Sequence, residues 1–110
     1  MIGRIEGQLV EISDNVVLVA VGGIGYELEV TSTALAQLGL GAPPGGRGQT
    51  VVLYTHFVVR EDAQQLYGFA SRGERDLFRT LIRISGVGPK LALNLISGVS
   101  LADLAAAVQA

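Results

Sequence analysis

The sequence predicts a mixed fold in which a β-barrel domain (residues 1–70) precedes a small helical domain (residues 71–110). Two observations support this prediction. Residues 1–70 contain short β-branched or alternating runs, whereas apolar residues after position 71 recur at helical spacing. The charge divides at the same point, because residues 1–70 carry a net charge of −4 and residues 71–100 carry +3.

Five short runs are typical of β-strands. The clearest covers residues 26–30, where Tyr, Leu and Val alternate with two glutamates, as on a strand with one buried face. The other runs cover residues 2–12, 16–21, 51–59 and 65–69. A short helix is expected over residues 31–38, with Thr31 or Ser32 as its N-cap.

This order of elements resembles an OB-fold, a five-stranded Greek-key barrel that often binds nucleic acid. The small size and the strand spacing favour a closed barrel over an open sheet. An SH3-like barrel is the alternative architecture. Residues 39–48 are rich in glycine and proline and are expected to form a flexible loop before the fourth strand.

The composition excludes several classes of protein. Apolar residues make up 49% of the 110 residues, yet no apolar run reaches the ~20 residues of a membrane-spanning helix. Because the chain has no cysteine and one histidine, it has no disulfide, thiolate metal site or multi-histidine zinc site. It has no Walker-type phosphate loop and no signal-peptide layout at its start. We therefore expect a cytoplasmic protein that needs no cofactor and hydrolyses no ATP.

From position 71 the pattern is helical. Ser71 or a neighbour is placed to cap a first helix, whose apolar face belongs to residues 74–84. A second helix is expected to start at Pro89, to have its apolar run at residues 91–96 and to end at Gly98.

A third helix is expected over residues 101–108. Ser100 and Asp103 have the spacing of a capping box at its start. Because the chain stops at Ala110, where this helix could still continue, we expect the chain to be a fragment.

A turn with two glycines, Gly86 and Gly88, joins the first two helices. Glycine adopts positive φ and lets another backbone approach closely. The first N–H groups of the next helix have no partner within it, and Lys90 adds a positive charge, so the turn is suited to a DNA phosphate. This pattern resembles a helix-hairpin-helix motif, and its candidate DNA-binding residues are Arg83, Ser85, Gly86, Val87, Gly88, Pro89 and Lys90. The alternative is an ordinary helical hairpin whose glycines only make the turn.

Arginine recurs at every fourth residue along the first of these helices, at Arg75, Arg79 and Arg83. Such a stripe is common on a solvated helix face. The neighbouring Lys90 and the glycine turn make contact with DNA an equally reasonable interpretation.

Glu61 and Asp62 are adjacent carboxylates at the expected tip of a hairpin between the last two strands. A solubilising turn is the simplest explanation. A catalytic pair or a metal site needs a further ligand or base, and none lies nearby in the sequence. A third interpretation is that two fixed negative charges beside DNA repel its phosphates.

The barrel part does not have the features of a groove for single strands. Such a groove combines basic residues with exposed aromatics, whereas this part of the chain is acidic. Tyr26 and Phe57 fall within strand patterns and are expected to belong to the core. His56 is expected to pack or to form a hydrogen bond rather than to act in catalysis.

Five motifs occur in one order along the chain: Met1–Arg4, Val21–Tyr26, Tyr54–Ala63, Leu66–Phe69 and Ser85–Ala92. Together they resemble the RuvA family, which binds Holliday junctions in bacterial branch migration. The resemblance covers essentially the whole chain. It implies a homotetramer that holds a four-way DNA junction open, with Glu61 and Asp62 as an acidic pin near the crossover. The residues from Ser85 to Lys90 match the first of two hairpin motifs that hold the duplex arms.

The resemblance also implies partners, namely the RuvB ATPase and the RuvC resolvase of the same complex. The second hairpin motif and the RuvB-binding domain would follow Ala110, and the loop at residues 39–48 looks longer than in the family. The implied function is sequence-independent junction binding in recombination and repair, without catalysis by this chain. Two other functions stay open: an oligomeric protein-interaction scaffold that uses the hairpin for subunit packing, and a nuclease fragment that uses the carboxylates.

Overall fold

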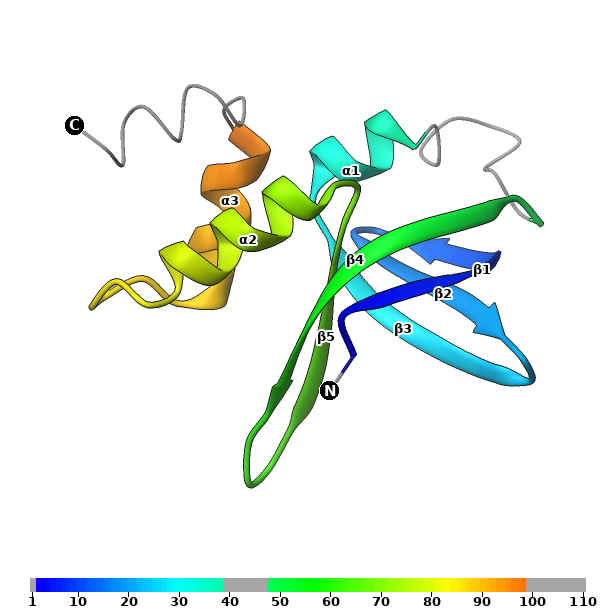
Figure 1. Cartoon of the computed structure of the whole chain (residues 1–110), viewed down its shortest axis with the longest axis horizontal. Helices are drawn as coiled ribbons and strands as arrows, with labels where there is room; N and C mark the ends of the chain where they lie inside the picture. The colour runs from blue at the N-terminus through cyan, green and yellow to red at the C-terminus, as the bar shows by residue number, and fades with distance from the viewer. Residues whose placement is uncertain (1, 39–47, 99–110) are drawn as a thin grey trace.

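The computed structural model describes residues 2–38 and 48–98 of the chain (Figure 1). Its strands lie close to the expected runs, with boundaries that differ by one or two residues. They are β1 (Arg4–Ser13), β2 (Val16–Val21), β3 (Ile24–Val30), β4 (Thr50–Val59) and β5 (Gln64–Phe69). The helices are α1 (Ser32–Gln37), α2 (Arg72–Leu81) and α3 (Pro89–Gly98).

The five strands close into a barrel in the order β1-β2-β3-β5-β4, and β4 pairs with β1 to complete it. All pairs are antiparallel except β3 with β5. This strand order and the helix between β3 and β4 confirm the prediction of an OB-like barrel followed by helices.

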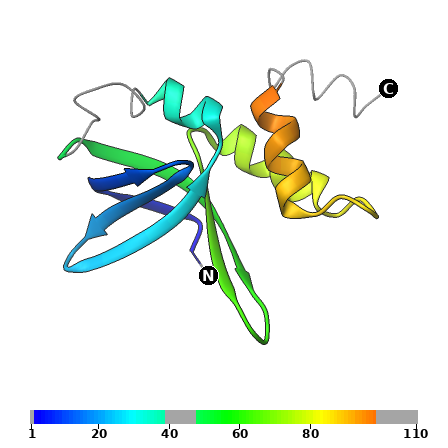
Figure 2. The ribbon, with the colours of Figure 1, turned by 180° about the vertical axis from the view of Figure 1, so that it is seen from behind.

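The parallel pairing of β3 with β5, which closes the barrel, is short, and it leaves part of β5 free of β3. β3 pairs only with Tyr67 and Gly68 of β5, whereas β4 pairs with the whole of β5. The first half of β5 and the end of β4 therefore extend past the barrel as a two-stranded hairpin. In Figures 1 and 2 the tip of this hairpin projects clear of the other elements.

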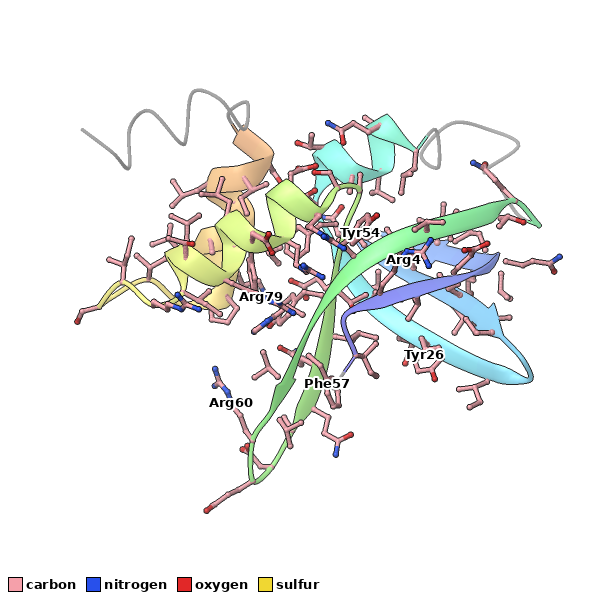
Figure 3. The ribbon with its side chains drawn as sticks, in the orientation of Figure 1. Arg4, Tyr26, Tyr54, Phe57, Arg60 and Arg79 are labelled. Carbon is pink, nitrogen blue, oxygen red and sulfur yellow. The ribbon has the colours of Figure 1, made fainter. Side chains whose placement is uncertain are left out.

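The barrel encloses an apolar core contributed by every strand and by α1. Alternate residues of the strands point inward, because successive side chains on a strand face opposite sides. The fully buried members are led by Leu9, Val17, Val19, Leu28 and Leu53. Tyr26 and Phe57 are half-buried and pack against this core, as expected from their strand patterns (Figure 3).

A second apolar core joins β5 to the helices. Tyr67 and Phe69 point out of the barrel and meet Phe78 of α2, with ring centroids 5.2 and 5.0 Å away. Residues of α3 complete this core, namely Ala92, Leu93 and Ile96. Because residues 66–69 of β5 are buried on both faces, the strand holds the helices against the barrel.

Local sequence chemistry sets the helix starts as expected. Thr31 caps α1, because its Oγ1 accepts the Ala34 N–H at 2.9 Å. Ser71 caps α2 and accepts the Glu74 N–H at 3.2 Å. Pro89 is the first residue of α3.

Some expectations are corrected or fall outside the described residues. The apolar run to position 84 predicted a longer first helix, but α2 ends at Leu81 and the chain turns after it. The loop at 39–48, apart from its last residue, and the third helix at 101–108 lie outside the described residues. The division into two domains after residue 70 stays a prediction. Among the described helices, none is long and apolar enough to cross a membrane.

Candidate nucleic-acid interface

The tip of the β4–β5 hairpin presents two adjacent carboxylates. The Arg60 N–H donates to the Ala63 carbonyl at 2.7 Å, which leaves Glu61 and Asp62 as a two-residue loop. Both are exposed. The acidic pair therefore lies on the exposed hairpin tip that the sequence predicted.

The turn between α2 and α3 is built from two short hydrogen-bonded steps. The Ile84 N–H donates to the Leu81 carbonyl at 3.0 Å, and the Val87 N–H donates to the Ile84 carbonyl at 3.0 Å. Gly86 has a φ of +87°, which a residue with a Cβ rarely adopts. The Val87 amide thus helps to close the turn and is not among the amides that are free to bind a ligand.

The amides on either side of Val87 remain available to a ligand. Gly86 and Gly88 are exposed. The first bond of α3 is donated by Ala92 to the Gly88 carbonyl at 3.0 Å, so the preceding N–H groups of Lys90 and Leu91 have no acceptor one turn back. Lys90 is exposed at the positive end of this helix dipole.

Gly88 has no conformational reason to be glycine. Its φ is not in the left-handed region, and a Cβ built on it would meet nothing within 4 Å in the described structure. The hairpin alone thus explains Gly86 but not Gly88. Empty space over an exposed backbone is what a second backbone would occupy on close approach.

A cleft of about 350 Å³ lies between the hairpin that carries the acidic tip and the start of α3. Asp62 and Ala63 line it from the hairpin, and Pro89 and Lys90 line it from the start of α3. A second cleft of about 280 Å³ lies between α3 and the turn from β1 to β2, and Lys90 borders this one too. Lys90 therefore borders both clefts from the N-terminal end of α3.

Sequence reasoning missed the three ionisable residues that line the larger cleft beside Asp62 and Lys90, namely Glu29, Arg60 and Tyr67. Figure 3 shows Arg60 on the side of the hairpin that faces the helices. Burial and then the charge of Glu29 raise the pKa of Tyr67, so its hydroxyl, which donates to Gln65, stays protonated. Arg60 could have been predicted from its place next to the acidic pair in the sequence. Glu29 could not, because nothing in the sequence indicates that β3 lies beside α3.

The arginine stripe of α2 does not form a free basic face. Arg75 Nη1 donates to the Gly3 carbonyl at 2.9 Å, and Arg79 Nη2 donates to the Thr55 carbonyl at 3.1 Å. Both arginines are half-buried, because they face the barrel rather than solvent. Contact with DNA requires exposed arginines, and of the three only Arg83, beyond the end of α2, is exposed.

His56 lies at the contact between β4 and α2. Its Nδ1 accepts the Arg79 Nε–H at 3.1 Å, and its ring meets the Phe78 ring edge-on at 5.5 Å. Burial, followed by the charges of Arg79 and Arg75, lowers the pKa of His56. The neutral imidazole packs and accepts a hydrogen bond, as the sequence predicted.

The described residues bring no three His, Cys, Asp or Glu side chains together in the manner of metal ligands. Within these residues the acidic tip has no third carboxylate or imidazole beside it. The charge of Lys90 is suited to attract a polyanion to the start of α3. The charges of Glu61 and Asp62 are suited to repel a polyanion from the hairpin tip.

Comparison with known proteins gives matches along the whole chain. A family model described as the RuvA N terminal domain matches residues 1–68, and one described as a SAM-like helix-hairpin-helix tandem matches residues 78–110. The boundary between these matches lies close to the change from strands to helices.

Curated relatives carry the name Holliday junction branch migration complex subunit RuvA. The relative from Stutzerimonas stutzeri is 53% identical over 110 residues, which is 100% of this chain and 52% of the relative. The relative from Alkalilimnicola ehrlichii is 56% identical over 100 residues, which is 91% of this chain and 45% of the relative. The chain thus spans about half the length of the curated relatives it matches. Since the RuvA N terminal domain model covers more than half of its residues, the chain belongs to the RuvA family.

Proposed function

We propose that this chain binds four-way DNA junctions by their sugar–phosphate backbone, as a non-catalytic subunit of a branch-migration complex in recombination and repair. The observation that carries the proposal is that Asp62 of the acidic tip and Lys90, which follows the open glycine turn, line one cleft. A simple duplex binder needs the turn but has no use for two fixed carboxylates opposite it. The names of the relatives support the same conclusion.

We assign the phosphate contacts to the turn. The exposed amides near Gly86 and Gly88 and the Lys90 ammonium would bind one stretch of backbone, because unpaired N–H groups and a cation at a helix start favour an anion. The remaining members of the proposed contact surface are Arg83, Ser85, Val87 and Pro89. Because we assign these groups to phosphate and not to base edges, we expect the binding to be independent of sequence.

We assign the opposite role to Glu61 and Asp62. Two like charges about 4 Å apart repel by about 1 kcal/mol in water and about 4 kcal/mol at an effective dielectric constant near 20. Phosphates approaching the hairpin tip would therefore be turned away from it. At the crossover of a junction this repulsion would favour strands that separate on either side of the tip.

The further partners are proposals that rest on family membership. We propose that four copies gather around the junction, that the longer protein contacts the RuvB ATPase and works beside the RuvC resolvase, and that it acts in the cytoplasm. We also propose that residues 1–70 and 71–110 act as two domains, one presenting the acidic pin and the other the helical hairpin.

A gel-shift comparison of a four-way junction with a linear duplex of the same arm sequence tests the proposal. We expect tighter binding to the junction, with an affinity for either DNA that falls as salt rises from about 50 to 200 mM. Equal affinity for the two DNAs would contradict the junction-binding function.

A second candidate function is a protein-interaction scaffold. Leu91 and Leu95 of α3 favour it, because they are 46% and 37% exposed, one turn apart beside the glycine turn. A scaffold would use this face to pack another subunit and would show no preference for a junction. The same gel shift therefore separates the two functions.

A further inference from the structure

We infer that Arg79 is a positioning residue that fixes the angle between the helical turn and the acidic tip, and thereby sets the preference for a junction over a duplex. The second half of this inference rests on the proposed function. The first half concerns the chain alone and can be tested without DNA.

The side chain of Arg79 bridges two elements that are distant in sequence. Its Nη2 donates to the Thr55 carbonyl at 3.1 Å and its Nε donates to His56 Nδ1 at 3.1 Å. Figure 3 shows Arg79 between α2 and β4. A planar guanidinium that donates to two adjacent acceptors fixes both the distance and the orientation of the groups it joins.

Both elements that leave this contact lead directly into the proposed site. β4 continues from His56 to Val59 and then into the loop of Glu61 and Asp62. α2 ends two residues after Arg79, at Leu81, and its continuation is the turn that contains Gly86. The cleft of about 350 Å³ lies between these two arms, so the angle at which they diverge sets its width.

The apolar contact at the same place is less directional. Phe78 packs on Tyr67, Phe69 and His56 with centroids 5.0 to 5.5 Å apart, and such ring contacts tolerate sliding. Without Arg79 the second core would still hold α2 on β5, and Arg75 would still hold it at Gly3, but no directional contact would join α2 to β4 next to the hairpin. The hairpin and the turn would then keep their own structures but lose their fixed spacing.

This separation of roles predicts a selective effect on DNA binding. A duplex needs only the turn, whereas on a junction the tip must lie where the strands part, because a misplaced tip would repel the phosphates of the arms. Loss of Arg79 should therefore leave duplex affinity unchanged and lower junction affinity. Because hydrogen bonds from a charged group are among the strongest in proteins, we expect the ratio of junction to duplex affinity to fall by about three- to tenfold.

The first test measures the spacing directly. The chain contains no cysteine, so Ala63→Cys and Leu91→Cys place two spin labels on exposed positions, one at each arm. We expect a single narrow distance distribution in the labelled chain and a broader or shifted one after Arg79→Gln. An unchanged distribution would overturn the inference.

The second test compares junction and duplex binding across three variants. Arg79→Gln removes both the positive charge and the planar guanidinium that donates two hydrogen bonds. Arg79→Lys keeps the charge but lacks this planar pair of donors. Arg4→Gln removes one exposed positive charge whose side-chain partner is Glu6. We expect both Arg79 variants to lose junction preference and to keep the salt dependence of duplex binding, while Arg4→Gln keeps both.

The outcomes distinguish this inference from the proposed function. One outcome is that Arg79→Lys keeps the junction preference of the unmodified chain while Arg79→Gln lowers the salt dependence of duplex binding. That outcome would mean that Arg79 contacts phosphate, and the inference would be wrong. If the unmodified chain shows no junction preference, the proposed function fails, and the spin-label distances alone decide whether Arg79 positions the two arms. If circular dichroism shows that Arg79→Gln does not fold, Arg79→Lys carries both tests.

Discussion

Asp62 and Lys90 line one cleft from opposite sides, Asp62 from the loop of the β4–β5 hairpin and Lys90 from the first turn of α3. The cleft thus presents a negative charge to a polyanion at Asp62 and a positive charge at Lys90. The short pairing between β3 and β5 makes this possible, because it frees the hairpin to extend past the barrel. The electrostatic roles of the two walls can be tested separately.

Replacing Lys90 with glutamine should weaken binding to junction and duplex alike. If the ammonium contacts one phosphate, the slope of log K against log salt should fall by about 0.9. Fluorescence anisotropy at several salt concentrations measures the slope, with Arg4→Gln as the control for loss of one positive charge elsewhere. A slope equal to that of the control would remove Lys90 from the phosphate contacts.

Neutralising the acidic tip should have the opposite effect on affinity. In Glu61→Gln with Asp62→Asn the repulsion of phosphates is gone, so we expect junction affinity to stay the same or to rise. Strand separation at the crossover should become less complete, which 2-aminopurine placed there reports as reduced fluorescence. A large loss of junction affinity would mean that these carboxylates help to bind DNA.

Substitution of the two glycines of the turn should affect stability and DNA binding differently. Gly86→Ala puts a Cβ on a residue with a φ of +87°, which should lower the free energy of unfolding by about 1–2 kcal/mol. Gly88→Ser meets open space and keeps a good N-cap residue, so the free energy of unfolding should change by less than about 0.5 kcal/mol.

DNA binding should respond in the reverse order. The new side chain at position 88 occupies the space that we assign to a DNA backbone, and junction affinity should fall about tenfold, as for the loss of one charge-assisted contact. Urea unfolding and gel shifts on both variants make the comparison. A Gly88→Ser variant with full affinity would show that Gly88 is not a contact.

Local chemistry made much of the fold predictable from sequence. Thr31, Ser71 and Pro89 mark helix starts because each satisfies or avoids orphan N–H groups within its own turn. The alternation of β3 likewise reports a strand with one buried face. The acidic tip followed from its place between two strands, and the glycine turn from its place between two helices.

The parts that sequence could not supply depend on contacts between distant segments. Arg79 and Arg83 have the same spacing in the sequence, yet one binds the carbonyl of Thr55 and the other is exposed. A repeat of four residues describes a helix face but not what covers it. The larger cleft was equally hidden, because Glu29 and Lys90 meet only through the closure of the barrel and the packing of α3.

His56 should make stability depend on pH. Its pKa is lowered from 6.5 in the folded chain, so the unfolded chain takes up the proton first as pH falls. The stabilising contribution is present above pH 6.5 and is lost progressively below it. Protonation also removes the Nδ1 acceptor that Arg79 uses.

Urea unfolding at about pH 7.5 and about pH 5.5 measures this effect. The control is His56→Gln, which keeps an acceptor oxygen but does not titrate. Glu74, whose pKa burial raises, is present in both proteins and cancels in the comparison. We expect the unmodified chain to lose more stability than the variant over this range, and equal losses would show that His56 contributes no pH dependence.

The most direct test of the central claim is an amide NMR titration of the chain with a four-way junction. The claim predicts large shifts for the backbone amides of Gly86, Gly88 and Lys90, and small ones for the outer strands β1 and β2. Shifts that cluster on β1 and β2 while the turn amides stay unchanged would contradict it.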